Sequence, residues 1–290
     1  MRAKLIVFLI HCFSKLPLRL SRGIARIVGT LACLVSARGY RVTQKNLEMV
    51  YPELSNAERK AMAVQSMKES AQMAMETPAV WFRGETWRQT KTLSVVAEEK
   101  LLKAKDTGRG VLVLMPHFGN WEMAGIHVAQ SMKSTAMYAP PKLAALDAVM
   151  RAGRFAAEMV PANAKGVMKV FKALKRGEMT LILPDQVPAE EGGIFAPFFD
   201  KPAFTMTLIQ KLVQKTNPVV LVVYAIRRNG GFDLGYMDPD PAIYSADDQE
   251  AVSALNRTIE TLVEKAPTQY QWEYKHYRKQ PDGISPYNGF

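Results

Sequence analysis

Short apolar runs alternate with amphipathic stretches along most of the chain, and this alternation predicts a sheet covered by helices. Strands are expected at Gly110–Met115, Thr135–Tyr138, Thr180–Leu183, Pro218–Ile226 and Phe232–Met237. Helices are expected at Glu98–Lys105, Asn120–Ser131, Leu143–Arg154, Ala164–Arg176, Phe204–Lys215 and Asp247–Lys265. The predicted fold is α/β, with a mixed, partly parallel central sheet flanked by helices.

A further helix is predicted upstream of this alternation. Ser55 and Glu58 have the spacing of a capping box, in which each residue bonds the backbone N–H of the other. The methionine-rich segment that follows is expected to stay helical to about Thr77 and to end at Pro78.

The N-terminal residues 1–40 differ from the rest of the chain in charge and hydropathy. Nine Lys and Arg residues precede the first acidic residue, Glu48, whereas the remaining residues are nearly balanced in charge. Two apolar runs, Leu5–Ser14 and Ile27–Ala37, flank Lys15, Arg19, Arg22 and Arg26. Neither run reaches the roughly 18–20 residues that cross a bilayer. We therefore expect residues 1–40 to be a basic apolar anchor, with an amphipathic helix lying at the membrane interface. Residues 41–290 should form a single α/β domain.

Other interpretations of this N-terminus stay open. A spanning helix and a removed signal peptide are the structural alternatives. A nucleic-acid-binding arm is a third, but we expect no nucleic-acid partner because long aliphatic runs are unusual in such arms. The two cysteines, Cys12 and Cys33, form no disulfide framework or metal spacing and favour a reduced, cytosol-facing protein.

The strongest chemical signal lies where the strand Gly110–Met115 ends. Pro116 closes the strand, His117 follows at once, and Glu122 comes five residues later. Asn120 is a good N-cap, so His117 should lie in the turn and Glu122 in the first helical turn. We expect the Glu122 carboxylate to hold one imidazole nitrogen, leaving the other free to take a proton as a general base. Composition alone makes such a His-x4-acid pair common. Its position at a strand–helix junction is therefore what favours a catalytic site here.

A second junction repeats this layout. Strand Thr180–Leu183 ends at Pro184, and Asp185 and Gln186 follow. If the two strands are parallel neighbours, their carboxyl ends open on one edge of the sheet, and His117 and Asp185 share a crevice. A simple turn is the alternative explanation for these residues.

Two other segments are candidates for substrate contacts. Arg151 and Arg154 could hold a phosphate or stabilise oxyanion charge, although most helical arginines are only solvated. The glycine-hinged aromatic segment Gly192–Phe199 could line an acyl groove or belong to the core. No serine elbow, phosphate loop, dinucleotide fingerprint or metal-ligand spacing occurs, so we expect no cofactor and no metal. A base without a resident nucleophile suggests that a substrate hydroxyl attacks.

Taken together, these segments resemble the bacterial lipid A biosynthesis acyltransferases of the late, lauroyl/myristoyl type. The resemblance covers nearly the whole chain. It rests on the basic apolar N-terminus, Arg41–Ser55, Pro116–Glu122, Arg151–Arg154, Leu183–Gln186 and Phe198–Thr205. The tail departs from the family pattern at Tyr270–His276, so we assign it no role. His11, His127 and His276 are interpreted as structural or surface groups.

The resemblance implies an inner-membrane enzyme at the cytoplasmic face. It would move a fatty acyl group from acyl carrier protein to the 3-hydroxyl of an acyl chain on a lipid A precursor. His117 and Glu122 match the family's catalytic pair, and Arg154 and Asp185 match functional positions; we place Asn120 and Gln186 beside them as substrate-binding candidates. The alternatives are a related acyltransferase with another acceptor, such as glycerol phosphate or a glycosylated phosphoinositide, and a non-enzymatic basic membrane- or nucleic-acid-binding protein.

Overall fold

A seven-stranded sheet forms the centre of the molecule in the computed structural model, which describes residues 2–289. The strand order is β1-β9-β8-β2-β5-β3-β4, and every neighbouring pair is parallel except β8 with β9. The strands are β1 (Thr92–Val96), β2 (Val111–Leu114), β3 (Ser134–Tyr138), β4 (Glu158–Pro161), β5 (Met179–Ile182), β8 (Val219–Arg228) and β9 (Gly231–Met237). The predicted α/β class with a mixed, partly parallel sheet flanked by helices is confirmed, and the sheet is largely parallel.

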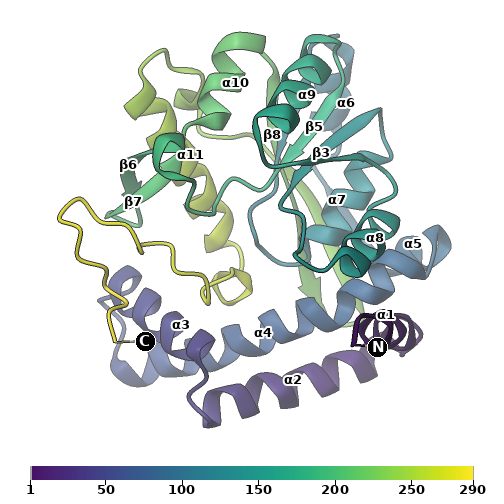
Figure 1. The fold of residues 1–290 in the computed structure, drawn as a ribbon, viewed down its shortest axis with the longest axis vertical. Helices are drawn as coiled ribbons and strands as arrows, with labels where there is room; N and C mark the ends of the chain where they lie inside the picture. The colour runs from purple at the N-terminus through teal and green to yellow at the C-terminus, as the bar shows by residue number, and fades with distance from the viewer. Residues whose placement is uncertain (1, 290) are drawn as a thin grey trace.

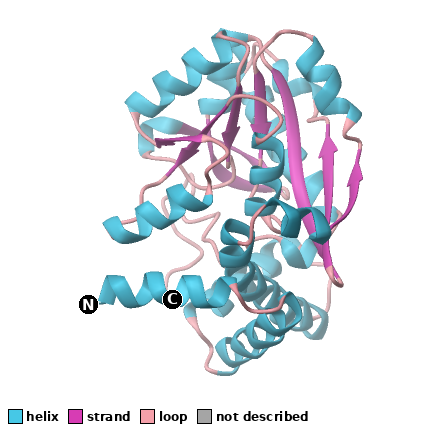
Figure 2. Cartoon of the chain, turned by 90° about the vertical axis from the view of Figure 1, so that its right-hand side faces the viewer, coloured by secondary structure: helices cyan, strands magenta, loops and turns pink. Residues whose placement is uncertain are grey.

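Helices cover both faces of this sheet, so its central strands are buried on both sides (Figures 1 and 2). On β2, Leu112 and Leu114 pack into one apolar cluster and Val111 and Val113 into the other. The first cluster is covered by α9 (Ala164–Lys175), α10 (Leu208–Thr216) and α11 (Asp248–Glu264). The second is covered by α6 (Glu99–Asp106), α7 (Trp121–Ala129) and α8 (Ala144–Gly153). Burial on both faces explains why β2 reads as a continuous apolar run rather than an alternating one.

The N-terminal helices pack as a layer below the sheet and its covering helices in the view of Figure 1. They are α1 (Arg2–Ser14), α2 (Leu18–Leu34), α3 (Arg38–Val50) and α4 (Asn56–Phe82). The long α4 is the central helix of this layer, and α1, α2 and α3 all contact it. At Gly29 the backbones of α2 and α4 come so close that a Cβ atom would lie 2.8 Å from Lys68 Cα.

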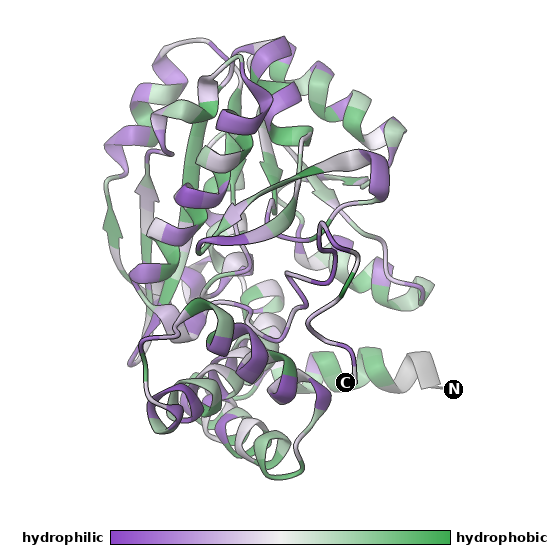
Figure 3. Ribbon diagram, turned by 90° about the vertical axis from the view of Figure 1, so that its left-hand side faces the viewer, coloured by the Kyte–Doolittle hydropathy of each residue, from purple (hydrophilic) through white to green (hydrophobic). Residues whose placement is uncertain are grey.

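The outward side of α2 is apolar. Ile27 is 62% exposed and Leu31 53% exposed, whereas Ala25 and Gly29 face α4 and are buried. Hydrophobic residues also dominate the described part of α1, beside the N label in Figure 3. Within residues 2–289, no single helix combines the length and the apolar composition needed to cross a bilayer; only α2 and α3 taken together do, and they are bent by 79°.

Several predicted elements change in the structure. The capping box at Ser55 and Glu58 is confirmed, with reciprocal N–H to oxygen distances of 2.8 and 3.3 Å. The prediction that this helix ends at Pro78 is wrong: α4 continues to Phe82. Its last turn is buried, and that packing outweighs the single backbone hydrogen bond that a proline removes.

Residues 192–206 were also partly misassigned. Gly193–Phe198 is strand β6, which pairs antiparallel with β7 (Lys201–Met206), so the predicted helix begins only at Leu208. Strands β1 and β4 were not predicted, because edge strands of mixed polarity lack a clear period. The short helix α5 (Glu85–Lys91) was not predicted either. Three short 3₁₀ turns complete the described elements, at Glu190–Gly192, Pro241–Tyr244 and Pro267–Gln269.

Candidate active site

The carboxyl ends of β2 and β5 bring His117 and Asp185 together. The two strands are parallel and in register, with Leu114 opposite Ile182, and the chain leaves each strand through a proline. Asp185 Oδ1 lies 2.7 Å from His117 Nδ1, and Asp185 Oδ2 accepts the His117 backbone N–H at 2.8 Å. The expectation that these two residues share one edge of the sheet is therefore confirmed.

Asp185 is held as a buried anion. Its side chain is only 2% exposed. Burial alone would raise the pKa of this carboxyl, but the His117 imidazole and backbone N–H more than offset that effect, so its pKa lies below the ordinary value. A carboxylate at Nδ1 places the imidazole proton there and leaves Nε2 as the acceptor.

The Nε2 side of the imidazole is more open. Gln186 Nε2 lies 3.3 Å from His117 Nε2, and the indole of Trp121 meets the imidazole edge-on at a centroid distance of 5.0 Å. Gln186 was predicted as a substrate-binding residue, and the structure places its amide against the nitrogen that a hydroxyl would approach. The arrangement is that of a fixed imidazole whose Nε2, contacted by the Gln186 amide, can take a proton.

Glu122 does not hold the imidazole. As predicted, Asn120 caps α7 and places Glu122 in its first turn. The Glu122 carboxylate, however, accepts hydrogen bonds from Arg154 Nε at 3.0 Å and from Trp81 Nε1 at 2.9 Å. The predicted His117–Glu122 contact is therefore wrong, because α7 directs Glu122 toward α8 and α4 while the Asp185 carboxylate, in the loop after the neighbouring strand β5, takes Nδ1. Sequence spacing could not reveal this, since Asp185 is 68 residues from His117.

Arg154, the predicted substrate-binding arginine, follows directly after α8. Burial alone would lower its pKa, but the Glu122 carboxylate raises it above the ordinary value, so the guanidinium stays charged. Gly153 allows Trp81 to pack against this segment, because a Cβ atom there would lie 2.4 Å from the indole ring. Trp81 carried no sequence signal, yet it fixes both Glu122 and the end of α8.

Both polar atoms of the Asn120 side chain form hydrogen bonds within the protein. Its side-chain oxygen accepts the Met123 N–H at 3.0 Å, and its Nδ2 donates to Glu76 Oε2 at 2.9 Å. The side chain is fully buried. We expected Asn120 to bind substrate, but both ends of its amide are occupied by the protein.

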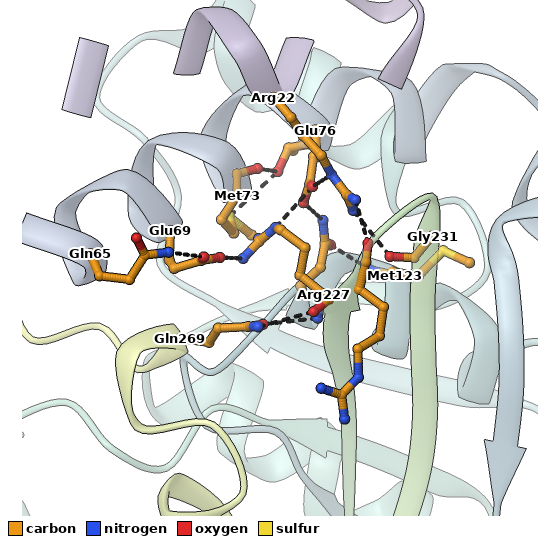
Figure 4. Close-up of polar contacts among 12 residues, drawn as sticks. Arg22, Gln65, Glu69, Met73, Glu76, Met123, Arg227, Gly231 and Gln269 are labelled. Carbon is orange, nitrogen blue, oxygen red and sulfur yellow. Dashed lines mark hydrogen bonds and ion pairs between the residues drawn. The ribbon is translucent and has the colours of Figure 1, made fainter. Parts of the chain in front are cut away.

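Glu76 is the centre of a buried charge network that sequence reasoning missed. Its carboxylate accepts hydrogen bonds from Arg22 on α2, Arg227 on β8 and Asn120, and Arg227 also reaches Glu69 (Figure 4). Burial would raise the pKa of Glu76, but the two arginines more than offset that effect and its pKa lies below the ordinary value. The network ties α2 to the loop that carries His117. No local pattern could indicate it, because its members come from four distant segments.

The turn between His117 and α7 requires glycine. Gly119 has φ +59°, and a Cβ atom there would lie 2.1 Å from the Ala225 carbonyl oxygen. This close approach lets Asn120 N–H bond the same carbonyl at 2.8 Å. The turn is thus pinned to β8.

The C-terminal tail, to which we assigned no role, forms one wall of the site. Gly119 N–H donates to Gln269 O at 2.8 Å, and Gln271 N–H donates to His117 O at 3.1 Å. His276 stacks on Tyr270 and is buried. Burial lowers the pKa of His276 to about 4, so this second histidine is neutral and structural, as expected.

An apolar pocket opens beside the Glu122–Arg154 pair. It is narrow, about 40 Å³, and lies between α7, β3, β5 and the end of α8. Its lining includes Met115, Met137 and Met159 together with small residues such as Ala136. Methionine side chains rearrange easily, so the pocket can widen for a flexible apolar chain. Among residues 2–289, no three His, Cys, Asp or Glu side chains are grouped so that they could hold a metal ion.

The chain is similar to known proteins over most of its length. The family described as bacterial lipid A biosynthesis acyltransferase matches residues 2–279. The chain is 27% identical to the lipid A biosynthesis palmitoleoyltransferase of Escherichia coli K12, over 89% of this chain and 85% of that protein. It is 24% identical to the lauroyltransferase of the same strain, over 89% and 85%, and 25% identical to its myristoyltransferase, over 83% and 76%.

Proposed function

Because the chain belongs to the bacterial lipid A biosynthesis acyltransferase family, we propose that it moves a fatty acyl group from acyl carrier protein to the 3-hydroxyl of an acyl chain on a lipid A precursor. The observation that carries this proposal is the His117 imidazole, whose Nδ1 lies 2.7 Å from the buried Asp185 carboxylate. His117 is the general base, and its Nε2 accepts the proton of the attacking hydroxyl.

The reaction follows from this arrangement. The hydroxyl oxygen attacks the thioester carbonyl carbon while Nε2 takes its proton, and Asp185 stabilises the imidazolium that forms. Collapse of the tetrahedral intermediate breaks the C–S bond, and the proton passes from Nε2 to the leaving thiolate. The thioester supplies the activation, so the step needs no nucleotide. General-base assistance of this kind contributes roughly 10²–10⁴-fold.

Glu122 and Arg154 act as a pair in this proposal. Their ion pair lines the apolar pocket, so Arg154 supplies positive charge where the acyl carbonyl would enter. Glu122 is then a positioning residue that holds Arg154 rather than the partner of His117. The pocket receives the acyl chain of the donor, with the methionines adjusting to its shape.

We also propose that α1 and α2 hold the enzyme at the cytoplasmic face of the inner membrane. The apolar outward side of α2 and the basic charge of the first 47 residues support an interfacial position. This placement would bring the lipid acceptor directly to the edge of the sheet where His117 lies.

The test is transfer by the purified full chain, with acyl carrier protein carrying a lauroyl or longer chain as donor and a lipid A precursor as acceptor. Mass spectrometry should show the acceptor gaining one acyl group. His117→Gln should lower kcat by roughly 10²–10⁴-fold. His127→Gln is the matched control, because His127 lies outside the site and approaches Glu98 at 4.0 Å. Failure of the wild-type chain to acylate any lipid A precursor, or full activity of His117→Gln, would refute the proposal.

A further inference from the structure

A large basic cavity lies between α2, α4 and the turn that joins β8 to β9. Its volume is about 1150 Å³. Arg and Lys supply seven of its lining side chains, against the single carboxylate of Glu69. Such an excess of cations in a concave site favours an anionic ligand.

Four of the seven cations are already bound to protein groups, and three are not. Arg22, Arg83, Arg227 and Arg228 bond carboxylates or backbone carbonyls. Arg19, Arg26 and Lys91 have no side-chain hydrogen bond or ion pair with any residue from 2 to 289. Their charges are available to a ligand in the cavity.

Unpaired buried donors line the same cavity. Gln72 Nε2, Trp87 Nε1 and Arg227 Nη2 are buried and lack an acceptor within the described chain. Gln72 is 0% exposed, and its side-chain oxygen is unpaired as well. A buried polar group without a partner is costly, and native proteins rarely leave several together. Three side chains that line one basic cavity thus carry unused N–H groups, which favours a ligand rich in hydrogen-bond acceptors, as a phosphate group is.

The position of the cavity identifies the molecule that carries this phosphate. Arg19, Arg22 and Arg26 recur on one side of α2, and Leu20, Ile27 and Leu31 form a solvent-exposed apolar stripe about 130° further around the same helix. A ligand with a charged headgroup and apolar chains can therefore place its headgroup in the cavity and its chains along α2. The cavity also shares Arg22 and Arg227 with the Glu76 network (Figure 4). That network reaches the His117 loop through Asn120.

We propose that this cavity binds the phosphate of a lipid headgroup, and that it thereby docks phosphorylated lipid beside the active site. The choice of a lipid rests on the proposed function. The headgroup has two sources, the phosphorylated acceptor itself or an anionic phospholipid of the membrane, and both present the same chemistry to the cavity.

The test uses the variant R19Q/R26Q/K91Q, which removes the three cavity cations that have no side-chain partner among residues 2–289. The matched control is K165Q/K211Q/K215Q, which has the same net charge but changes exposed lysines of α9 and α10 that make no side-chain interaction within the described chain. In the acceptor arm, KM is measured in detergent with a phosphorylated lipid A precursor and with the same lipid after phosphatase treatment. In the membrane arm, binding is measured to phosphatidylcholine vesicles with and without phosphatidylglycerol.

A tenfold or larger rise of KM for the phosphorylated acceptor alone, at unchanged kcat, supports the acceptor as the source. A similar loss of affinity for phosphatidylglycerol vesicles alone supports the membrane lipid. If the cavity variant behaves like the control in both arms, the proposal is overturned. The membrane arm needs no acyl transfer, so failure of the proposed function would be recognised separately.

Gln72→Met provides a second test that separates ligand binding from folding. Removing an orphaned buried amide should leave the free protein as stable as before or raise its melting temperature. The same variant should weaken binding in the arm that responds to the triple variant. A Gln72→Met protein that is destabilised yet binds normally would show that the amide serves the fold and not a ligand.

Discussion

Asp185→Asn is the substitution that most directly tests how the imidazole is held. In the structure both carboxylate oxygens are used: Oδ1 lies 2.7 Å from His117 Nδ1, and Oδ2 accepts the His117 backbone N–H at 2.8 Å. A backbone N–H can only donate, so the new amide must turn its oxygen toward it. The amide NH₂ then faces Nδ1 and forces that nitrogen to accept. The imidazole proton moves to Nε2, and the base is lost.

The size of the effect follows from these contacts. Turning the amide the other way restores the tautomer but leaves two buried donors facing each other, at a cost of about 1–3 kcal/mol. Loss of the negative charge weakens the hydrogen bond to the imidazolium by about 1.5–3 kcal/mol more. Together these effects correspond to a decrease of roughly 10²–10⁴-fold in kcat. KM should change little, because Asp185 is buried behind the imidazole.

The assay is steady-state acyl transfer, with melting temperature as the check on folding. Asp238→Asn is the control, because Asp238 is 66% exposed and pairs with Lys100 at the surface. Glu122→Gln is the informative comparison: it should act through Arg154 and Trp81 and should not convert the imidazole to the inactive tautomer. A folded Asp185→Asn enzyme that retains more than a tenth of the wild-type kcat would refute this account of His117.

Four other predictions follow from the structure. Gly119→Ala should reduce transfer at least a hundredfold, because its Cβ would lie 2.1 Å from Ala225 O at a positive φ; normal activity would contradict the pinned turn. Glu76→Gln should lower the urea-derived free energy of unfolding by about 3–5 kcal/mol, since it leaves two buried arginines short of a counter-charge. Burial lowers the pKa of His276 from 6.5 to about 4, so between these two pH values the unfolded chain binds one more proton than the folded protein. Stability should therefore fall by about 3 kcal/mol as pH decreases through this range, and His276→Gln should remove that slope. Ala136→Leu should narrow the apolar pocket and shift donor preference toward shorter acyl chains, at about 1–3 kcal/mol per displaced methylene, measured as a kcat/KM ratio between two donors.

Features that depend on a local pattern of residues could be predicted from the sequence alone. Buried central strands such as Val111–Leu114 are continuous apolar runs in the sequence. The Ser55 cap indicates the start of α4, and a proline followed by a polar residue indicates where two of the strands end. It also placed Asp185 on the same sheet edge as His117, because parallel strands end together. These signals need only neighbouring residues or the general geometry of a sheet.

The tertiary structure alone decided which charged groups pair. Glu122 is five residues from His117 along the chain, yet it binds Arg154, and Asp185 takes the imidazole. The choice depends on the direction in which α7 leaves its turn, and that direction is set by Gly119 packing on β8. The Glu76 network and the basic cavity likewise join segments far apart in sequence. Such pairings are fixed by packing and desolvation in three dimensions, and no local spacing of residues encodes them.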